Sequence, residues 1–281
     1  AEGGAGLVWA EATAVCHEGR ANPHQLLIND TTAGQLAALR RLFNDGQVVG
    51  LQLTHSGRYS RPDGAAAPRT AYRHPLLDAP SGASETSLLT DGELDDLVAL
   101  FVDRAVLAGE AGFDFVDVKA CHGYLGHELL TAFDRPGSYG GDFVNRTRFM
   151  RSIIEGIRTA APGLAVGVRF SVFDSVPYVP GADGRGVPAT EEPYRFAFGA
   201  DEHGRGIDLR EPLALVEMLR SLGVGLLCTT AGSPYYCPHV QRPAFFPPSD
   251  GYLPPEDPLV GVARQVAATA ALSRSAPDMV I

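Results

Sequence analysis

Five polar residues lie at, or just after, the ends of stretches that read as buried strands. Gln52, Lys119 and Arg169 each stand opposite in parity to the apolar residues of their strand, and His122 and Tyr124 follow Lys119 closely. In strand–helix repeat proteins, chemistry gathers at the carboxyl ends of the strands. Hydrogen-bond donors there, two of them cationic, would hold an anionic or electron-rich planar ligand and stabilise developing negative charge.

The strand before His122, predicted over Phe113 to Lys119, shows how these side chains are aimed. Successive strand residues face opposite sides, so Val116 and Val118 share one face while Asp117 and Lys119 share the other. The valines suit packing against helices. Two charges on the inner face are costly unless they are paired or used.

Strands and helices alternate along the chain. Strands are predicted at 6–15, 48–54, 113–119, 164–171, 224–229 and from Met279 onward, and helices at 36–43, 94–108, 149–157, 215–222 and 259–273. Alternation of this kind predicts an α/β fold with parallel strands and helices outside. No linker or fixed-period repeat divides residues 1–281, so we expect one domain.

The sequence also contains helix-cap signals and long loops between the predicted strands and helices. Thr90 with Glu93 forms a capping box, and Asp208 with Glu211 is a second cap signal. Long loops are predicted at 56–90, 172–206 and 232–258, and a connection of such length can line a site. Neither G-x-G-x-x-G nor a P-loop occurs, and residues 181–186 (GADGRG) are read as a turn.

Composition limits the possible partners. The chain has 281 residues, 45% of them hydrophobic, and a formal net charge of −10 without a basic run. Such a chain is a poor candidate for binding nucleic acid or an anionic membrane. No apolar run is long enough to span a bilayer. The four cysteines form no C-x-x-C pair, which predicts no zinc or iron–sulfur site within these residues and favours a reduced, cytoplasmic setting.

Some of these residues also have a structural interpretation. Arg169 could be an internal ion-pair partner of Glu11 or Asp117, and Gln52 could be a hydrogen-bonded core amide. His127 is interpreted as structural. Tyr235 and Tyr236 are interpreted as loop anchors rather than catalytic residues.

The central stretch resembles a known family. HGYL followed by YGGDFVNRTRF, together with WAEATAV, Gly19-Arg20, QLTHSGR and VRFS, is similar in order and spacing to the old yellow enzyme family of flavin-dependent NAD(P)H oxidoreductases. That family includes the 2,4-dienoyl-CoA reductase and trimethylamine dehydrogenase branches. The resemblance covers nearly the whole chain and implies a (β/α)8 TIM barrel with FMN at its C-terminal mouth.

The resemblance also implies roles for cofactor residues. Ala12 matches the position whose backbone N–H approaches the N5/O4 edge of the flavin. Gln52 matches the glutamine that contacts the pyrimidine ring. Arg169 matches the arginine beside N1 and O2, which stabilises the reduced, anionic flavin.

The acceptor side matches with one departure. His122 corresponds to the second member of the family's substrate-anchoring pair, and Tyr124 corresponds to the tyrosine that commonly protonates the alkene. Lys119 stands where the first histidine is usual. A lysine is a point charge on a flexible stem rather than a planar donor, although it could hold a carbonyl or carboxylate oxygen or contact the flavin.

The resemblance further implies a barrel that is incomplete at both ends in this sequence. Its first strand should precede Ala1, and its last strands, with the loops that hold the FMN phosphate, should follow Ile281. An iron–sulfur cluster and a second nucleotide domain, as in the dienoyl-CoA branch, are expected only if the chain continues beyond Ile281. Family members often self-associate, so a homo-oligomer is expected, but the sequence pattern does not identify an interface.

The sequence therefore predicts an FMN-dependent enzyme that passes hydride from NAD(P)H through flavin N5 to an activated alkene, enoyl or related small molecule. Lys119 and His122 would polarise the acceptor and Tyr124 would supply the proton. Two alternatives stay open. Lys119 could be the Schiff-base lysine of an aldolase-type lyase, or the chain could be a flavin-binding barrel without catalytic activity.

Overall fold

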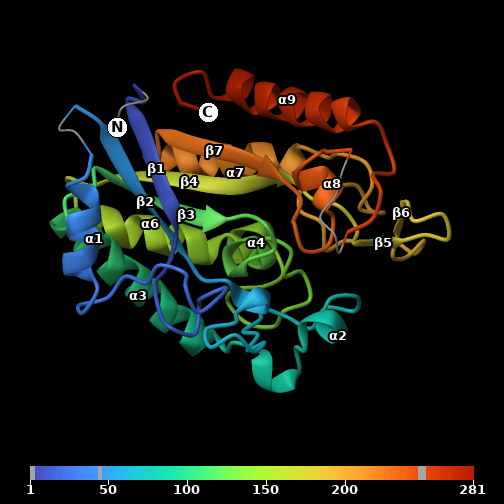
Figure 1. Cartoon of the computed structure of the whole chain (residues 1–281), viewed down its shortest axis with the longest axis horizontal. Helices are drawn as coiled ribbons and strands as arrows, with labels where there is room; N and C mark the ends of the chain where they lie inside the picture. The colour runs from blue at the N-terminus through green and yellow to red at the C-terminus, as the bar shows by residue number, and fades with distance from the viewer. Residues whose placement is uncertain (1–3, 44–45, 246–250) are drawn as a thin grey trace.

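The computed structural model describes residues 4–43, 46–245 and 251–281, and a five-stranded parallel sheet forms its centre (Figure 1). The strands are β1 (Leu7–Ala14), β2 (Val48–Thr54), β3 (Phe115–Ala120), β4 (Ala165–Phe173) and β7 (Leu226–Ala231). Each strand lies beside the preceding strand of the sheet, in the order β1-β2-β3-β4-β7. Sequential order is what a barrel requires, whereas a doubly wound sheet reverses direction partway. The predicted α/β class with parallel strands is confirmed.

Long helices pack against one face of the sheet, and short helices lie in the connections between strands (Figure 1). They are α1 (Ala33–Arg40), α2 (Asp78–Ser81), α3 (Asp91–Glu110), α4 (Leu125–Leu129), α5 (Phe143–Arg146), α6 (Arg148–Ala160), α7 (Arg210–Ser221), α8 (Pro238–Gln241) and α9 (Pro258–Ser275). The apolar stripe of α3 packs against α6, where the rings of Phe101 and Phe149 meet edge to face at 5.6 Å. Val116 and Val118 of β3 belong to this core, as the strand alternation predicted.

Two strands, β3 and β7, begin two residues later than predicted. Phe113 donates its backbone N–H to Ala108, and Val224 donates to Leu219, so each closes the preceding helix instead of opening a strand. At the sixth predicted strand the described residues show only an isolated parallel bridge, between Val280 and Leu226.

The long predicted loops carry short elements. Residues 56–90 contain α2 and the 3₁₀ helices Gly57–Tyr59 and Glu85–Ser87. Residues 172–206 contain a hairpin of β5 (Tyr178–Pro180) and β6 (Gly186–Pro188), which confirms the turn predicted at 181–186. Of the predicted loop 232–258, residues 246–250 lie outside the described residues, and the rest includes α8.

The two predicted caps have different outcomes. Thr90 caps α3 as a complete capping box with Glu93, which confirms that prediction. The cap predicted at Asp208 is wrong, because Leu209 is the N-cap of α7 and Asp208 instead accepts hydrogen bonds from the backbone and side chain of Arg210.

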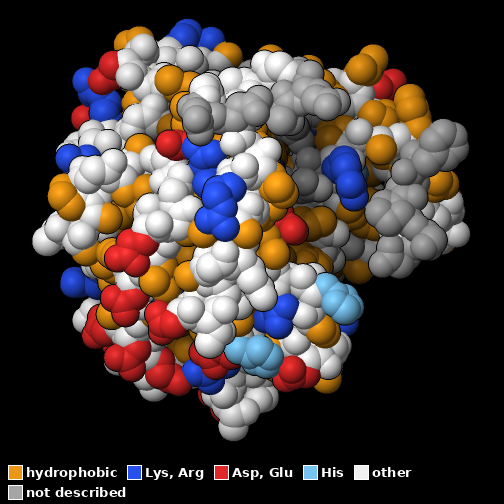
Figure 2. Space-filling view, turned by 60° about the vertical axis from the view of Figure 1, so that its left-hand side comes forward, with side chains coloured by type: hydrophobic (Ala, Val, Ile, Leu, Met, Phe, Trp, Pro, Cys, Tyr) orange, Lys and Arg blue, Asp and Glu red, His pale blue; other side chains and the backbone are white. Residues whose placement is uncertain are grey.

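Acidic residues outnumber basic ones in the chain, with 33 Asp and Glu residues against 23 Lys and Arg residues. Figure 2 shows one face on which Asp and Glu side chains gather at the lower left, while Lys and Arg side chains are scattered. This face therefore offers no continuous basic patch. Among the described residues, no helix combines the length and apolar character needed to cross a membrane.

Candidate active site

Strand register aligns the predicted residues in two rows on the inner face of the sheet. Ala12 pairs with Gln52, and Gln52 pairs with Asp117, which gives the first row. Two residues further along, Lys119 pairs with Arg169, and this row continues to Cys228 of β7. The two rows together contain residues from all five strands of the sheet.

Ala12 lies at an irregularity of the β1–β2 ladder. The register shifts between Trp9 and Ala12. Bulges of this kind redirect backbone groups and are common beside active sites. The carbonyl of Ala12 accepts a hydrogen bond from Gln25 at 2.8 Å, which ties the strand end to the following loop.

Asp117 forms the buried centre of the first row. One of its oxygens, Oδ2, accepts hydrogen bonds from Gln52 Nε2 and from Trp9 Nε1, the latter at 3.0 Å, while Oδ1 is buried without a partner. Burial raises the pKa of Asp117 to about 6, although these two donors oppose the rise. Gln52 is therefore hydrogen-bonded within the core, as one interpretation expected; its contact with flavin stays a prediction.

Arg169 carries a donor that the protein itself does not use. Its Nε is buried and makes no hydrogen bond. In the described part of the chain no ion pair joins Arg169 to Glu11 or Asp117. The positive charge of Arg169 nevertheless offsets part of the rise in the pKa of Asp117. A buried guanidinium N–H without an acceptor is costly unless a ligand supplies one.

Lys119 is buried, and its ammonium lies over an aromatic ring. Nζ is 3.9 Å from the centre of the Tyr124 ring, a cation–π contact. Burial lowers the pKa of Lys119, and the nearby Arg169 lowers it further. The sequence placed Lys119 and Tyr124 in one site, and the structure brings them into contact.

Tyr124 directly precedes α4, and its hydroxyl meets a second tyrosine. The hydroxyls of Tyr124 and Tyr235 are 3.1 Å apart, and the Tyr235 ring stacks on Tyr59 with centroids 3.8 Å apart. Burial, together with Tyr235, raises the pKa of Tyr124 well above its ordinary value, so its phenol stays protonated at neutral pH. Tyr235 was predicted to be a loop anchor; its ring stacks on Tyr59 of another loop, and its hydroxyl also reaches Tyr124.

His122 has a left-handed backbone conformation, with φ of 64°, which is uncommon outside glycine. Its carbonyl accepts a hydrogen bond from Ser233 at 2.8 Å, and its Nε2 is 3.4 Å from Thr230 Oγ1. Burial lowers its pKa to about 3, with Lys119 and Arg169 adding to the effect, so the imidazole is neutral. Strained backbone of this kind concentrates at functional sites.

His127 has the structural setting that the sequence suggested. Its Nδ1 accepts the backbone N–H of Gly123 at 2.9 Å, and its Nε2 lies 3.8 Å from Asp174. Tyr236 donates its hydroxyl to the same carboxylate at 2.5 Å, which fits the predicted anchor. These residues hold the loop behind His122.

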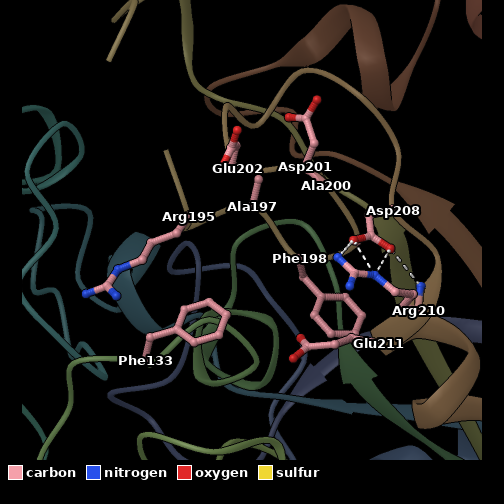
Figure 3. A pocket seen from close by; sticks show the side chains of 11 residues that line it. Phe133, Arg195, Ala197, Phe198, Ala200, Asp201, Glu202, Asp208, Arg210 and Glu211 are labelled. Carbon is pink, nitrogen blue, oxygen red and sulfur yellow. Dashed lines mark hydrogen bonds and ion pairs between the residues drawn. The ribbon is translucent and has the colours of Figure 1, made fainter. Parts of the chain in front are cut away.

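Two other parts of the molecule bring polar side chains together. A cavity of about 560 Å³ lies beside Phe133, Phe198 and Glu211 (Figure 3). Its charged groups largely pair with each other or with neighbours: Arg210 with Asp208, and Glu211 with Arg146. None of the six predicted site residues lines it.

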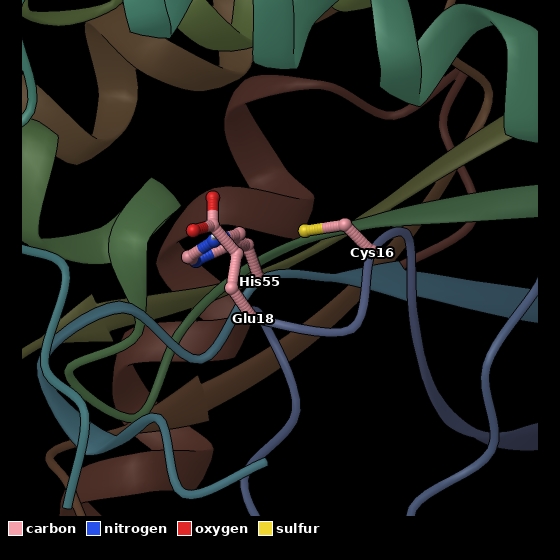
Figure 4. Close-up of side chains that lie close together, drawn as sticks. All are labelled: Cys16, Glu18 and His55. Carbon is pink, nitrogen blue, oxygen red and sulfur yellow. Dashed lines mark ion pairs between the residues drawn. The ribbon is translucent and has the colours of Figure 1, made fainter.

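The second cluster brings Cys16, Glu18 and His55 together, with their donor atoms within 4.8 Å of one another (Figure 4). His55 Nδ1 accepts the backbone N–H of Gly57, so Nε2 is the ring nitrogen that faces Glu18, at 3.9 Å. Burial raises the pKa of Cys16 to about 11. Because burial keeps the Cys16 thiol protonated and the backbone already occupies Nδ1 of His55, the cluster lacks the deprotonated sulfur ligand that a zinc site needs.

The residues of the inner face fit the flavin ring that the resemblance implies. The unused Nε of Arg169, the amide of Gln52 and the ammonium of Lys119 come from three neighbouring strands. An isoalloxazine ring is planar and presents several acceptor atoms along one edge. Donors aligned this way suit such a ring, and the reduced, anionic form would gain most from the two cations.

Comparison with known proteins gives consistent findings. A family model described as "NADH:flavin oxidoreductase / NADH oxidase family" matches residues 1–187. An NADPH dehydrogenase of Halalkalibacterium halodurans is 32% identical over 167 residues, which are 58% of this chain and 48% of that protein. One from Listeria monocytogenes is 36% identical over 182 residues, 62% and 51% of the two chains. The chain spans about half the length of these relatives.

Two solved structures resemble the fold. Histamine dehydrogenase from Rhizobium sp. 4-9 aligns with a TM-score of 0.61 and 23% identity, over 83% of this chain and 31% of that one. A 2-naphthoyl-CoA reductase complex aligns with a TM-score of 0.62 and 18% identity, over 83% and 34%. At these identities the likeness shows the fold alone. It confirms the predicted barrel architecture, of which these residues form a part.

Proposed function

The chain belongs to the NADH:flavin oxidoreductase / NADH oxidase family, and from this premise we propose that it is an FMN-dependent enzyme that uses NAD(P)H to reduce a small activated alkene or enoyl compound. One observation carries the proposal: Gln52, Lys119 and Arg169, from three adjacent strands, present donors on one inner face, with His122 and Tyr124 beside them. A small-molecule acceptor and a cytoplasmic setting belong to the same proposal.

The cofactor side uses the first row and Arg169. When bound, FMN supplies the centre that takes hydride from NAD(P)H and passes it to the acceptor. The backbone N–H of Ala12, at the bulge in β1, would meet the N5/O4 edge. Gln52, whose orientation is fixed by its hydrogen bond to Asp117, would contact the pyrimidine ring. Arg169 would donate to the N1/O2 edge and stabilise negative charge there.

The acceptor side uses Lys119, His122 and Tyr124. The ammonium of Lys119 and the N–H of the neutral His122 would hold an oxygen of the acceptor and draw electron density from its double bond. Tyr124, whose raised pKa keeps its phenol protonated at neutral pH, would then donate that proton to the alkene carbon. Tyr235, 3.1 Å from that hydroxyl, would fix its direction.

Visible absorbance tests this proposal directly. The purified gene product, as isolated or after reconstitution with FMN, should show a flavin spectrum that bleaches when NADPH or NADH is added without oxygen. Addition of an activated alkene should restore the colour. A protein that cannot be loaded with FMN would refute the proposal, and a bleached flavin that no acceptor reoxidises would favour the non-catalytic alternative.

One observation favours the lyase alternative, namely the lowered pKa of the buried Lys119. An uncharged amine can attack a carbonyl carbon and lose water to form a Schiff base. Borohydride reduction in the presence of a carbonyl compound would then attach that compound to Lys119, and mass spectrometry of the peptide would detect it. A bound, reducible flavin would argue against this activity.

A further inference from the structure

Lys119 is unusual in this chain, because it is the only lysine among 23 Lys and Arg residues. Every other cationic side chain of this group is an arginine. The single lysine is 8% exposed and stands on the inner face of β3, in the candidate acceptor site. At this one buried position the chain has a compact ammonium, which can pair with a single acceptor atom, instead of the planar guanidinium of an arginine.

The charge around Lys119 is not balanced by the protein. Arg169 lies beside it on β4, and neither cation forms an ion pair within the described residues. The titratable groups whose charges act on the pKa of Lys119 are Cys121, Arg169 and Asp117. Oδ2 of Asp117 already accepts from Gln52 and Trp9, and His122 nearby is neutral. Two cations thus face one carboxylate, which leaves a net positive charge.

A buried excess charge calls for a ligand of the opposite sign. A pair of neutral imidazoles, which the family resemblance would place at Lys119 and His122, suits an uncharged carbonyl oxygen. With an ammonium in place of one imidazole, the same position attracts a full negative charge. Pairing would also withdraw electrons from a conjugated carboxylate, which by itself is a weak activator of an alkene.

We propose that the acceptor of this protein is a small unsaturated carboxylic acid whose carboxylate pairs with the Lys119 ammonium. The inference rests on the proposed function in one respect, namely that the bound acid is the acceptor in the reaction. The preference for a carboxylate over a neutral group of the same shape depends only on the inner face of the sheet.

Benzoate and benzamide provide the test, since they share a planar shape and differ in charge. Binding is measured at neutral pH from the change in flavin absorbance, or by calorimetry if the protein holds no flavin. Wild-type protein should bind benzoate at least about tenfold more tightly than benzamide. Lys119→Met, which keeps length and suits a buried strand, should abolish this ratio, whereas Lys119→Arg, which keeps the charge, should retain most of it.

A second readout does not depend on a variant's folding. With lysine labelled by ¹³C at Cε, the resonance that disappears in Lys119→Met reports this residue, and saturating benzoate should raise its pKa, while benzamide should not. Equal affinities for the two ligands in wild-type protein, or a ratio unchanged in Lys119→Met, would overturn the proposal. A lower flavin potential in Lys119→Met with an unchanged ratio would assign the ammonium to the flavin and overturn it too. Failure to bind flavin would refute the proposed function, but the ratio of benzoate to benzamide affinity could still be measured by calorimetry.

Discussion

At the scale of single residues, strand parity predicted which side chains share the inner face. Gln52 lies there in one row, and Lys119 and Arg169 lie in the next, because side chains of a buried strand alternate strictly between its two faces. The partners of these residues were not predictable. Tyr235 reaches Tyr124 across 111 positions of sequence, and no local pattern marks such a contact.

Arg169 should control the redox potential of the bound flavin. Its cationic group has a buried, unused Nε on the inner face, so Arg169→Ala removes charge that favours the reduced, anionic ring. We expect the midpoint potential to fall by roughly 30–60 mV, by Coulomb attraction in a partly buried site. Spectroelectrochemical titration measures the potential, with Arg169→Lys as the charge-conserving control. An unchanged potential in Arg169→Ala would remove this residue from the N1/O2 edge.

Tyr235 should position the proton donor. Tyr235→Phe keeps the stack on Tyr59 and removes only the hydroxyl that meets Tyr124. Reoxidation of the reduced flavin by an alkene should slow by about tenfold, the effect of losing one orienting hydrogen bond of about 1.4 kcal/mol. Reduction by NAD(P)H, followed separately by stopped flow, should be unaffected and is the internal control. Equal slowing of both half-reactions would mean a general structural effect instead.

At the scale of elements, the motif that carries the family resemblance serves mainly to hold helices in place. Tyr139 donates its hydroxyl to Asp95 of α3 at 2.6 Å, and Asp142 caps α5. Gly140 lies so close to Arg135 that an added Cβ would be 2.1 Å from its carbonyl oxygen. Arg146 is buried and pairs with Glu211 of α7. The sequence showed the motif, but its spacing alone did not reveal that these residues join α3, α5 and α7.

Helix boundaries were predictable where a local signal exists. The Thr90–Glu93 capping box marks the start of α3 because both hydrogen bonds form within four residues. The similar signal at Asp208 failed, since Arg210 competes for the same carboxylate through both its backbone and its guanidinium. A cap signal read from spacing does not include such a competitor.

Loss of the α3 cap should therefore have a measurable cost. In Thr90→Ala the N–H of Glu93 loses its acceptor, Thr90 Oγ1 at 3.2 Å, and the free energy of unfolding should fall by about 1 kcal/mol. Urea denaturation would show a lower midpoint with an unchanged slope. Thr159→Ala is the matched control, because this exposed threonine lies inside α6 and its hydroxyl bonds only to the carbonyl of Glu155. A Thr90→Ala midpoint equal to the control's would mean that the cap contributes nothing.

At the scale of the whole molecule, alternating elements predicted a parallel sheet with helices outside, and the strand order followed the chain. That residues 1–281 form one domain stays a prediction. The contacts that hold the long loops in place were not predicted, because they are made by buried polar side chains that lie far apart in the sequence. Arg58 pairs with Glu128, and His74 Nε2 meets the hydroxyl of Tyr194 at 2.8 Å, which joins the loops 56–90 and 172–206.

The His74–Tyr194 contact should make the stability of the whole fold depend on pH. His74 Nδ1 accepts backbone N–H groups from Leu76 and Leu77, so the folded state requires a neutral ring, and burial lowers the pKa of His74 to about 3. Between this value and the unfolded pKa of about 6.5, the unfolded chain binds more protons, so stability falls as pH falls. From pH 7 to pH 5 this one group should cost about 2 kcal/mol.

Other buried groups titrate over the same range, so the test compares slopes. Asp117, with its pKa raised to about 6, has the opposite sign: its contribution is present at low pH and is lost as pH rises through that pKa. The free energy of unfolding of His74→Gln, which cannot take up a proton, cancels such terms when subtracted from that of wild-type protein. Wild-type protein should lose about 2 kcal/mol more than His74→Gln between pH 7 and pH 5 in urea titrations. Parallel curves would show that His74 protonates in the folded protein as readily as in the unfolded chain, and that its contact with Tyr194 does not require the neutral ring.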